Sequence, residues 1–399
     1  MKVKQFPIGI WNYAPIERID EARVEEWAEC GLTLPMSPEF RDTPADVARM
    51  KQILDWADAR GMQVIVCDPR TADFSNPRYA DSAARAAADF GSHPACFAFR
   101  VLDEPGEAEW KATADACPAI RKAAPGVEPF VNHLPWYDGV EKRVGFPSFE
   151  EYLDTFIRRS GISILCYDCY SQMLPDGAGL PMYWRNLETY RAMSLKHQIP
   201  FWNTILSVGH FHYRCPSEDD MRWQFYTTIA YGAKGILYFF FYMRMPHDNY
   251  RLAPIDELWD RTPMYYTLKR LNRGFLRKWG KLMLELSNVS VTHWPEAPIP
   301  QTRVWQPGRM LEEVWADKRH LLLSEFVDGQ SRPYFMVVNN STTESTYAVL
   351  GFSGEQTRAF VRDWDGNEAE VALRRENGLS RTGQWLCPGQ MEVYRVEGR

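Results

Sequence analysis

Residues 96–105 read Cys-Phe-Ala-Phe-Arg-Val-Leu-Asp-Glu-Pro, a short apolar run that ends in two adjacent acids and a proline. Its length and composition are typical of a buried β-strand, and Pro105 cannot continue a strand ladder. Further apolar runs of strand length alternate with stretches of helix length through the first 286 residues. The eight runs are 8–13, 32–36, 63–67, 96–102, 128–133, 162–167, 201–206 and 235–241. Eight repeated strand–helix units predict an α/β fold, a (β/α)8 TIM barrel.

An open, doubly wound parallel sheet is the alternative to a closed barrel. Such sheets usually carry a glycine-rich phosphate loop after the first strand. Here the first run is followed by Trp11-Asn-Tyr-Ala-Pro15, which is no such loop. The pattern therefore favours the barrel.

After residue 286 the pattern changes to short alternating strands separated by Gly, Asn, Asp and Ser turns. This change predicts two domains, a barrel at 1–286 and a C-terminal all-β, sandwich-like domain at 287–399. The second domain groups no catalytic residue types. We expect it to be a scaffold, with a sugar-binding module as the alternative.

The composition narrows the possible partners. The chain has 399 residues, of which 45% are hydrophobic and 25% charged, as in ordinary globular proteins. Its net charge is −6 and it has no long basic run, so we expect neither nucleic acid nor a membrane as a partner. No signal peptide is recognisable and the eight cysteines are scattered, which predicts a cytoplasmic protein with reduced thiols. Nothing in the sequence predicts an oligomeric state.

Side chains at the ends of the predicted strands are the candidate site, because the chemistry of such barrels lies at the carboxyl ends of the strands. These ends combine aromatic rings with acids, amides and histidines. Sugars need this mixture, since their C–H faces stack on rings and their hydroxyls bind polar groups. The candidate substrate-binding residues are Trp11, Asp68, Asn132, His133, Tyr167, Tyr170, Trp202, Asn203, His210 and Tyr242. Trp11 and Trp202 are the expected stacking platform, and no metal site is expected.

Asp103 and Glu104 are the strongest signal, because two adjacent acids end an apolar strand. Like charges this close raise each other's pKa, so one carboxyl can stay protonated near neutrality and act as a general acid. In the alternative reading they are solvated acids at the start of the next helix, which Pro105 opens.

The chain resembles the clan A glycoside hydrolases, including the family-42 β-galactosidase-like group. The resemblance rests on the eight-fold pattern, a Glu after the fourth strand, the segment Gly232-Ala-Lys-Gly-Ile-Leu-Tyr-Phe239 and the following β-domain. It implies that Glu104 is the acid/base. It also places Asp103 where those enzymes carry an Asn that contacts the sugar 2-hydroxyl. The chain departs from the pattern at residues 200–207, which lack the expected nucleophilic glutamate.

Three explanations of this departure remain open. The Asp103-Glu104 pair is also similar to that of substrate-assisted β-N-acetylhexosaminidases of the family-123 type, whose substrate supplies the nucleophile. Alternatively, Asp168 is the nucleophile or base, or a structural acid. In the third case catalysis is lost and the chain is a noncatalytic carbohydrate-binding protein. We expect a hydrolase for a small glycan or glycoside that uses no cofactor.

Overall fold

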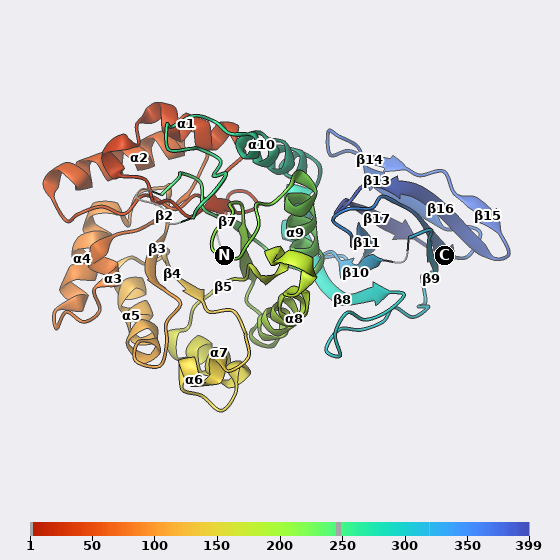
Figure 1. Ribbon diagram of the computed structural model, residues 1–399, viewed down its shortest axis with the longest axis horizontal. Coiled ribbons are helices and arrows are strands. Elements are labelled where there is room, and N and C mark those ends of the chain that lie inside the picture. The colour runs from red at the N-terminus through yellow and green to blue at the C-terminus, as the bar shows by residue number, and fades with distance from the viewer. Residues whose placement is uncertain (1–2, 245–248, 319, 399) are drawn as a thin grey trace. The chain divides into compact units, whose positions relative to one another are not determined.

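The computed structural model describes residues 3–244, 249–318 and 320–398 (Figure 1). The chain divides into two compact units. The first comprises the residues up to 215 together with 234–272, and the second comprises 216–233 together with 273–399. A domain boundary between residues 286 and 287 stays a prediction.

The first unit contains a seven-stranded parallel sheet in the order β1-β7-β6-β5-β4-β3-β2. Its strands are β1 (Ile8–Ile10), β2 (Val64–Val66), β3 (Cys96–Asp103), β4 (Glu128–His133), β5 (Leu165–Asp168), β6 (Phe201–Leu206) and β7 (Ile236–Phe239). Its helices are α1 (Glu21–Glu29), α2 (Pro44–Ala59), α3 (Pro69–Ala72), α4 (Tyr79–Phe90), α5 (Trp110–Ala123), α6 (Val140–Val144), α7 (Phe149–Ser160) and α8 (Leu180–His197). Figure 1 shows these helices outside the strands.

Local sequence explains where the helices begin and end, as α7 illustrates. The Ser148 side chain accepts the backbone N–H of Glu151, and acids occupy the first turn of the helix. Arginines occupy its last turn, where they complement the helix dipole. Gly161 follows with φ +59°, the left-handed conformation that favours glycine at a helix end. The chain is thereby turned back toward β5.

Residues 32–36 were predicted to form a strand, and this detail is wrong. Only Met36 makes a bridge, parallel to Ile65, and Pro35 cannot donate to a ladder. The segment still joins the two edge strands of the sheet. The amide of Leu34 donates to the carbonyl of Ile8 at 3.0 Å, and the amide of Ile65 donates to the carbonyl of Pro35 at 3.0 Å. The barrel predicted from the sequence is therefore confirmed, with the irregular segment 32–36 in the place of one strand.

Gly9 allows the segment 32–36 to lie close to β1. A Cβ atom at position 9 would lie 2.2 Å from the carbonyl oxygen of Leu34 and 2.4 Å from a methyl carbon of Leu237. The contact with Leu34 involves backbone, which cannot rotate away. The barrel closes at this point because residue 9 has no side chain.

The second unit contains two antiparallel sheets, which confirms the predicted β-sandwich-like region. Their orders are β14-β13-β17-β11-β10-β8 and β15-β16-β12-β9. The strands are β8 (Ser287–Trp294), β9 (Leu311–Ala316), β10 (Leu321–Val327), β11 (Pro333–Asn339), β12 (Thr346–Ser353), β13 (Arg358–Arg362), β14 (Glu368–Glu370), β15 (Arg374–Glu376), β16 (Leu379–Leu386) and β17 (Met391–Glu397). Apolar side chains from both sheets, among them Val314, Leu323 and Phe352, share one buried core.

The described chain has three further α-helices, besides short 3-10 and π-helical turns. They are α9 (Glu218–Ala230), α10 (Pro263–Phe275) and α11 (Lys281–Glu285). The helix α9 and α11 belong to the second unit, and α10 runs across the division at residue 272. Among the described residues, no helix combines the length and the apolar character needed to cross a bilayer.

The close approach at Gly9 generates a stability prediction. Gly9→Ala should lower the free energy of unfolding by about 1–3 kcal/mol, because the new methyl group overpacks a contact with backbone. The measurement is the urea unfolding midpoint followed by tryptophan fluorescence. Gly329→Ala is the control, since a Cβ at 329 meets nothing within 4 Å. Equal midpoints for the two variants would contradict the packing argument.

Candidate active site

Three carboxyl groups meet at the carboxyl ends of β3 and β5. Asp103 ends β3, Glu104 follows it, and Asp168 ends β5. The strand between them, β4, contributes Asn132, whose side-chain amide donates to Asp103 Oδ1 at 3.0 Å and to Asp168 Oδ1 at 2.8 Å. A side-chain hydrogen bond with Asp168 lowers the pKa of Glu104, so in this contact Asp168 is the protonated donor and Glu104 the acceptor.

The backbone turns sharply at Glu104. Its φ is +49°, in the left-handed region that residues other than glycine rarely adopt. Its amide donates to the carbonyl of Asn132 at 2.8 Å, and the carbonyl of the following Pro105 accepts the hydroxyl of Tyr152 at 3.2 Å. Strained backbone of this kind persists where the surroundings fix it, and it occurs often at functional sites.

The environment favours the protonated forms of these acids. Burial, and then the charge of Asp103, raise the pKa of Glu104 to about 7. Burial and the charges of Glu104 and Asp103 raise the pKa of Asp168 well above its ordinary value. Burial also raises the pKa of Asp103, against the hydrogen bond from Asn132 and the charge of Arg100. Since Asp103 still has an exposed surface, this carboxyl faces water on one side and dense protein on the others.

Half-buried aromatic rings surround the acids. The hydroxyl of Tyr170 is hydrogen-bonded to Asp168, and its ring stacks on Phe239 with 5.2 Å between centroids. Tyr13 meets Phe239 edge-on at 6.0 Å. Burial and the charge of Asp103 raise the pKa of the Tyr13 hydroxyl, which therefore keeps its proton and can donate it to a ligand. Rings and donors lie together beside the carboxyl groups.

His210 and Arg244 extend this region. The guanidinium of Arg244 lies 4.1 Å from the Tyr13 ring centroid. His210 packs against Tyr170 and Tyr213, with ring centroids at 5.8 and 5.1 Å. Burial, together with the charges of Arg251 and Arg244, lowers the pKa of His210 to about 4. The imidazole is therefore neutral near pH 7.

The structure brings five predicted residues into direct contact and places the two tryptophans elsewhere. The five are Asp103, Glu104, Asn132, Asp168 and Tyr170. Trp11 is 3% exposed, and its indole N–H donates to Thr204 at 3.3 Å. Trp202 is fully buried and stacks on Phe97 at 6.0 Å. Both rings fill the barrel interior, so neither offers a face to a ligand.

Four other candidates are buried, and the contacts described for three of them are with residues outside the acid cluster. His133 lies 3.2 Å from the hydroxyl of Tyr152 on α7, and burial lowers its pKa to about 3. Tyr167 stacks on Tyr190 of α8 at 3.8 Å. The hydroxyl of Tyr242 accepts the indole N–H of Trp27 at 2.7 Å. Asn203 on β6 is also fully buried.

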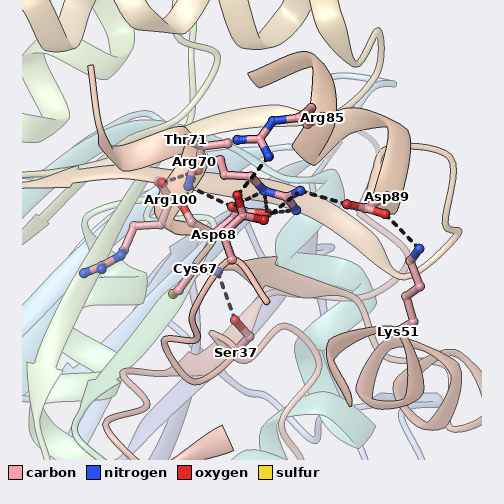
Figure 2. Close-up of polar contacts among 10 residues, drawn as sticks. Ser37, Lys51, Cys67, Asp68, Arg70, Thr71, Arg85, Asp89 and Arg100 are labelled. Carbon is pink, nitrogen blue, oxygen red and sulfur yellow. Dashed lines mark hydrogen bonds and ion pairs between the residues drawn. The ribbon is translucent and has the colours of Figure 1, made fainter. Parts of the chain in front are cut away.

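Asp68 belongs to a separate ionic network. It is 1% exposed, it caps α3 by accepting the amide of Arg70 at 2.8 Å, and it pairs with the guanidinium of Arg70 at 2.7 Å. Figure 2 shows that guanidinium between Asp68 and Asp89, with Lys51 on the far side of Asp89. Asp68 is thus committed to intramolecular partners and is not available for a sugar hydroxyl.

Four residues near the acids, Tyr13, Tyr213, Phe239 and Arg244, were not among the predicted substrate-binding residues. A period of two along the first strand could have identified Tyr13, because a residue two positions beyond the inward-facing Trp11 faces the same way. The two rings are indeed stacked, at 6.4 Å. Among the described residues, no group of three or more His, Cys, Asp or Glu side chains is arranged to hold a metal ion.

Comparisons with known proteins identify the fold. No family model and no curated protein match the sequence. A solved structure described as a glycoside hydrolase has a TM-score of 0.61 at 14% identity, over 98% of this chain and 92% of that chain. A glycoside hydrolase family 5 protein from Bacteroides vulgatus has a TM-score of 0.61 at 13% identity, over 98% and 89%. A family 39 glycoside hydrolase from Bacteroides cellulosilyticus has a TM-score of 0.55 at 11% identity, over 98% and 81%. The chain shares their barrel fold.

The raised pKa of Glu104 predicts a pH-dependent cost to stability. As the pH rises from about 4.3, the ordinary value, through 7, the unfolded chain loses this proton before the folded chain does, and the free energy of unfolding falls. Glutamine cannot ionise. We therefore expect Glu104→Gln to be more stable than wild type at pH 8, by about 1–3 kcal/mol, and to lose most of this gain at pH 5.

Urea unfolding at both pH values measures the effect. Glu17→Gln, which changes an exposed glutamate of the same unit, should show no such gain. A Glu104→Gln variant that is less stable than wild type at pH 8 would show that Glu104 is an ionised structural acid.

Proposed function

We propose that this chain hydrolyses glycosidic bonds in a small glycan or glycoside, with Glu104 as the proton donor to the leaving oxygen. The observation that carries the proposal is the burial of Glu104 beside the charge of Asp103, which raises the pKa of Glu104 to about 7 at the carboxyl ends of the strands. General acids are most effective when their pKa lies near the working pH. The fold shared with proteins described as glycoside hydrolases supports the same reaction class.

The surrounding side chains suit a sugar. Tyr13, Tyr170 and Phe239 present partly exposed ring surface on which the C–H face of a pyranose can stack. The hydroxyl of Tyr13 and the free surface of Asp103 can bind sugar hydroxyls.

Asp168 is better suited to position Glu104 than to attack the sugar. Burial and the charges of Glu104 and Asp103 raise the pKa of Asp168 well above its ordinary value, and a protonated carboxyl group is a poor nucleophile. Its Oδ1 also accepts the side-chain amide of Asn132 at 2.8 Å. We therefore assign Asp168 to positioning Glu104, to which it is hydrogen-bonded.

A nucleophile supplied by the substrate is compatible with this geometry. A 2-acetamido group can attack the anomeric carbon if an ionised carboxylate holds its N–H. Asp103 is adjacent to Glu104; burial raises its pKa, and the hydrogen bond from Asn132 and the charge of Arg100 oppose that rise. The strand β6 has no acid among Phe201–Leu206, so it supplies no carboxylate nucleophile, and a nucleophilic group of the substrate would fill this role.

The decisive variant is Glu104→Gln, assayed on aryl glycosides with good and poor leaving groups. Loss of the proton donor should lower turnover of the poor leaving groups by about 10²–10⁴-fold and spare the good ones. The panel pairs 2-hydroxy with 2-acetamido glycosides. Faster cleavage of the acetamido member of each pair would identify the substrate as the nucleophile.

Glu109→Gln is the matched control. Glu109 lies in the same segment, but its carboxylate accepts the amide of Gly106 at 3.2 Å and lies outside the acid cluster. Equal losses of Glu104→Gln on both leaving-group classes would exclude an acid role. A wild-type chain that binds these glycosides and cleaves none would instead be a carbohydrate-binding protein.

A further inference from the structure

The second unit carries an unusual aromatic surface on the sheet β15-β16-β12-β9. One face of this sheet supplies Val314, Ala348 and Leu350 to the buried core. Its other face should be polar, as is usual for the solvated face of an antiparallel sheet. Instead Trp315 is 48% exposed and Trp385 is 64% exposed. Large exposed aromatic rings are unfavourable in water and commonly mark a binding surface.

The register places these rings in one group. Trp385 on β16 is opposite Tyr347 on the central strand β12, and Trp315 on β9 is opposite Val349, two residues further along β12. The rings of Tyr347 and Trp385 are in contact, 5.6 Å apart at 61°. With strands spaced by about 4.8 Å, the two tryptophans flank β12 at roughly 10 Å from each other across the sheet.

Two positions on this outward face, Gly383 and Gly351, carry no side chain. A Cβ at Gly383 would lie 2.5 Å from the hydroxyl oxygen of Tyr347, so the phenol lies over this glycine. A Cβ at Gly351 would lie 2.8 Å from the Cβ of Glu313. Between the two tryptophans the outward face of β12 carries the half-buried Val349, and Gly351 follows it between Glu313 and Arg381. Small side chains between the rings leave room for an extended molecule.

The charges beside the rings neutralise each other. Arg381 binds Glu313 through two nitrogens, at 2.7 and 3.1 Å. On the neighbouring edge strand Arg374 pairs with Glu376 at 3.0 Å. Nucleic acids and anionic lipids need cations that are free to bind phosphate. Paired charges around aromatic rings are complementary to an uncharged, hydroxyl-rich ligand.

We propose that the face formed by Trp315, Tyr347 and Trp385 binds a neutral polysaccharide chain. Sugar rings stack their C–H faces on the two indoles, and sugar hydroxyls reach the Tyr347 hydroxyl and the Glu313–Arg381 pair. This site is separate from the acid cluster of the first unit. It holds a glycan whether or not Glu104 supports hydrolysis.

Native affinity electrophoresis of the full chain tests the proposal, with hydroxyethyl cellulose, xylan or galactan in the gel. We expect at least one polysaccharide to retard the wild-type chain, and Trp315→Ala and Trp385→Ala each to weaken that retention by about fivefold or more. Trp364→Ala is the matched control, because Trp364 is 74% exposed and lies outside this face, between β13 and β14. It should be retained like wild type.

Retention measures binding alone, so a failure of hydrolysis does not affect the result. Melting temperatures check that each variant is folded. Wild-type migration unchanged by all three polysaccharides would overturn the proposal, as would equal retention of all variants. Sedimentation velocity tests the alternative that this face binds a second copy of the chain. A dimer that Trp315→Ala or Trp385→Ala dissociates would show that this face binds a second copy of the chain instead.

Discussion

The burial of three neighbouring carboxyl groups, Asp103, Glu104 and Asp168, is the constraint on which the site depends. These acids would repel one another if all were ionised. Burial and this repulsion raise the pKa of Glu104 to about 7 and the pKa of Asp168 well above its ordinary value. The side-chain amide of Asn132 donates to both Asp103 and Asp168 and so stabilises negative charge on them. The packing that brings the acids together thus also favours a proton donor among them.

The barrel supplies the positions that this cluster needs. The strands β3, β4 and β5 are adjacent in the sheet, and their register aligns Asp103 with Asn132 and Asn132 with Cys166. Asp168 is two residues beyond Cys166 and faces the same way. Glu104 reaches the group only through its left-handed backbone, which Asn132 holds through a backbone hydrogen bond. Parallel strands thus bring together residues that are distant in the sequence.

The barrel and the β-domain were predictable, because the alternation of apolar runs of strand length with stretches of helix length persists even where one strand is irregular. The acid pair and Asn132 were also predictable, because the chemistry of such barrels lies at the carboxyl ends of the strands. Position at a strand end alone does not separate residues that face inward from residues that face outward. His133 and Tyr167 are one position away from Asn132 and Asp168 and face the helices, because alternate residues of a strand point to opposite sides. Trp202 lies too early in β6 to reach its end and fills the interior. Contacts made by loops, such as that of Arg244 with Tyr13, leave no periodic signal in the sequence.

Infrared difference spectroscopy of the carboxyl stretch, recorded while the pH is raised from 5 to 9, tests the central claim most directly. A protonated carboxylic acid absorbs separately from a carboxylate, so a retained proton is observed without any substrate. We expect a carboxylic acid band in the wild-type chain at pH 6, part of which disappears with a midpoint near pH 7, and we expect this part to be missing in Glu104→Gln. A wild-type spectrum at pH 6 that contains only ionised carboxylates would contradict this claim.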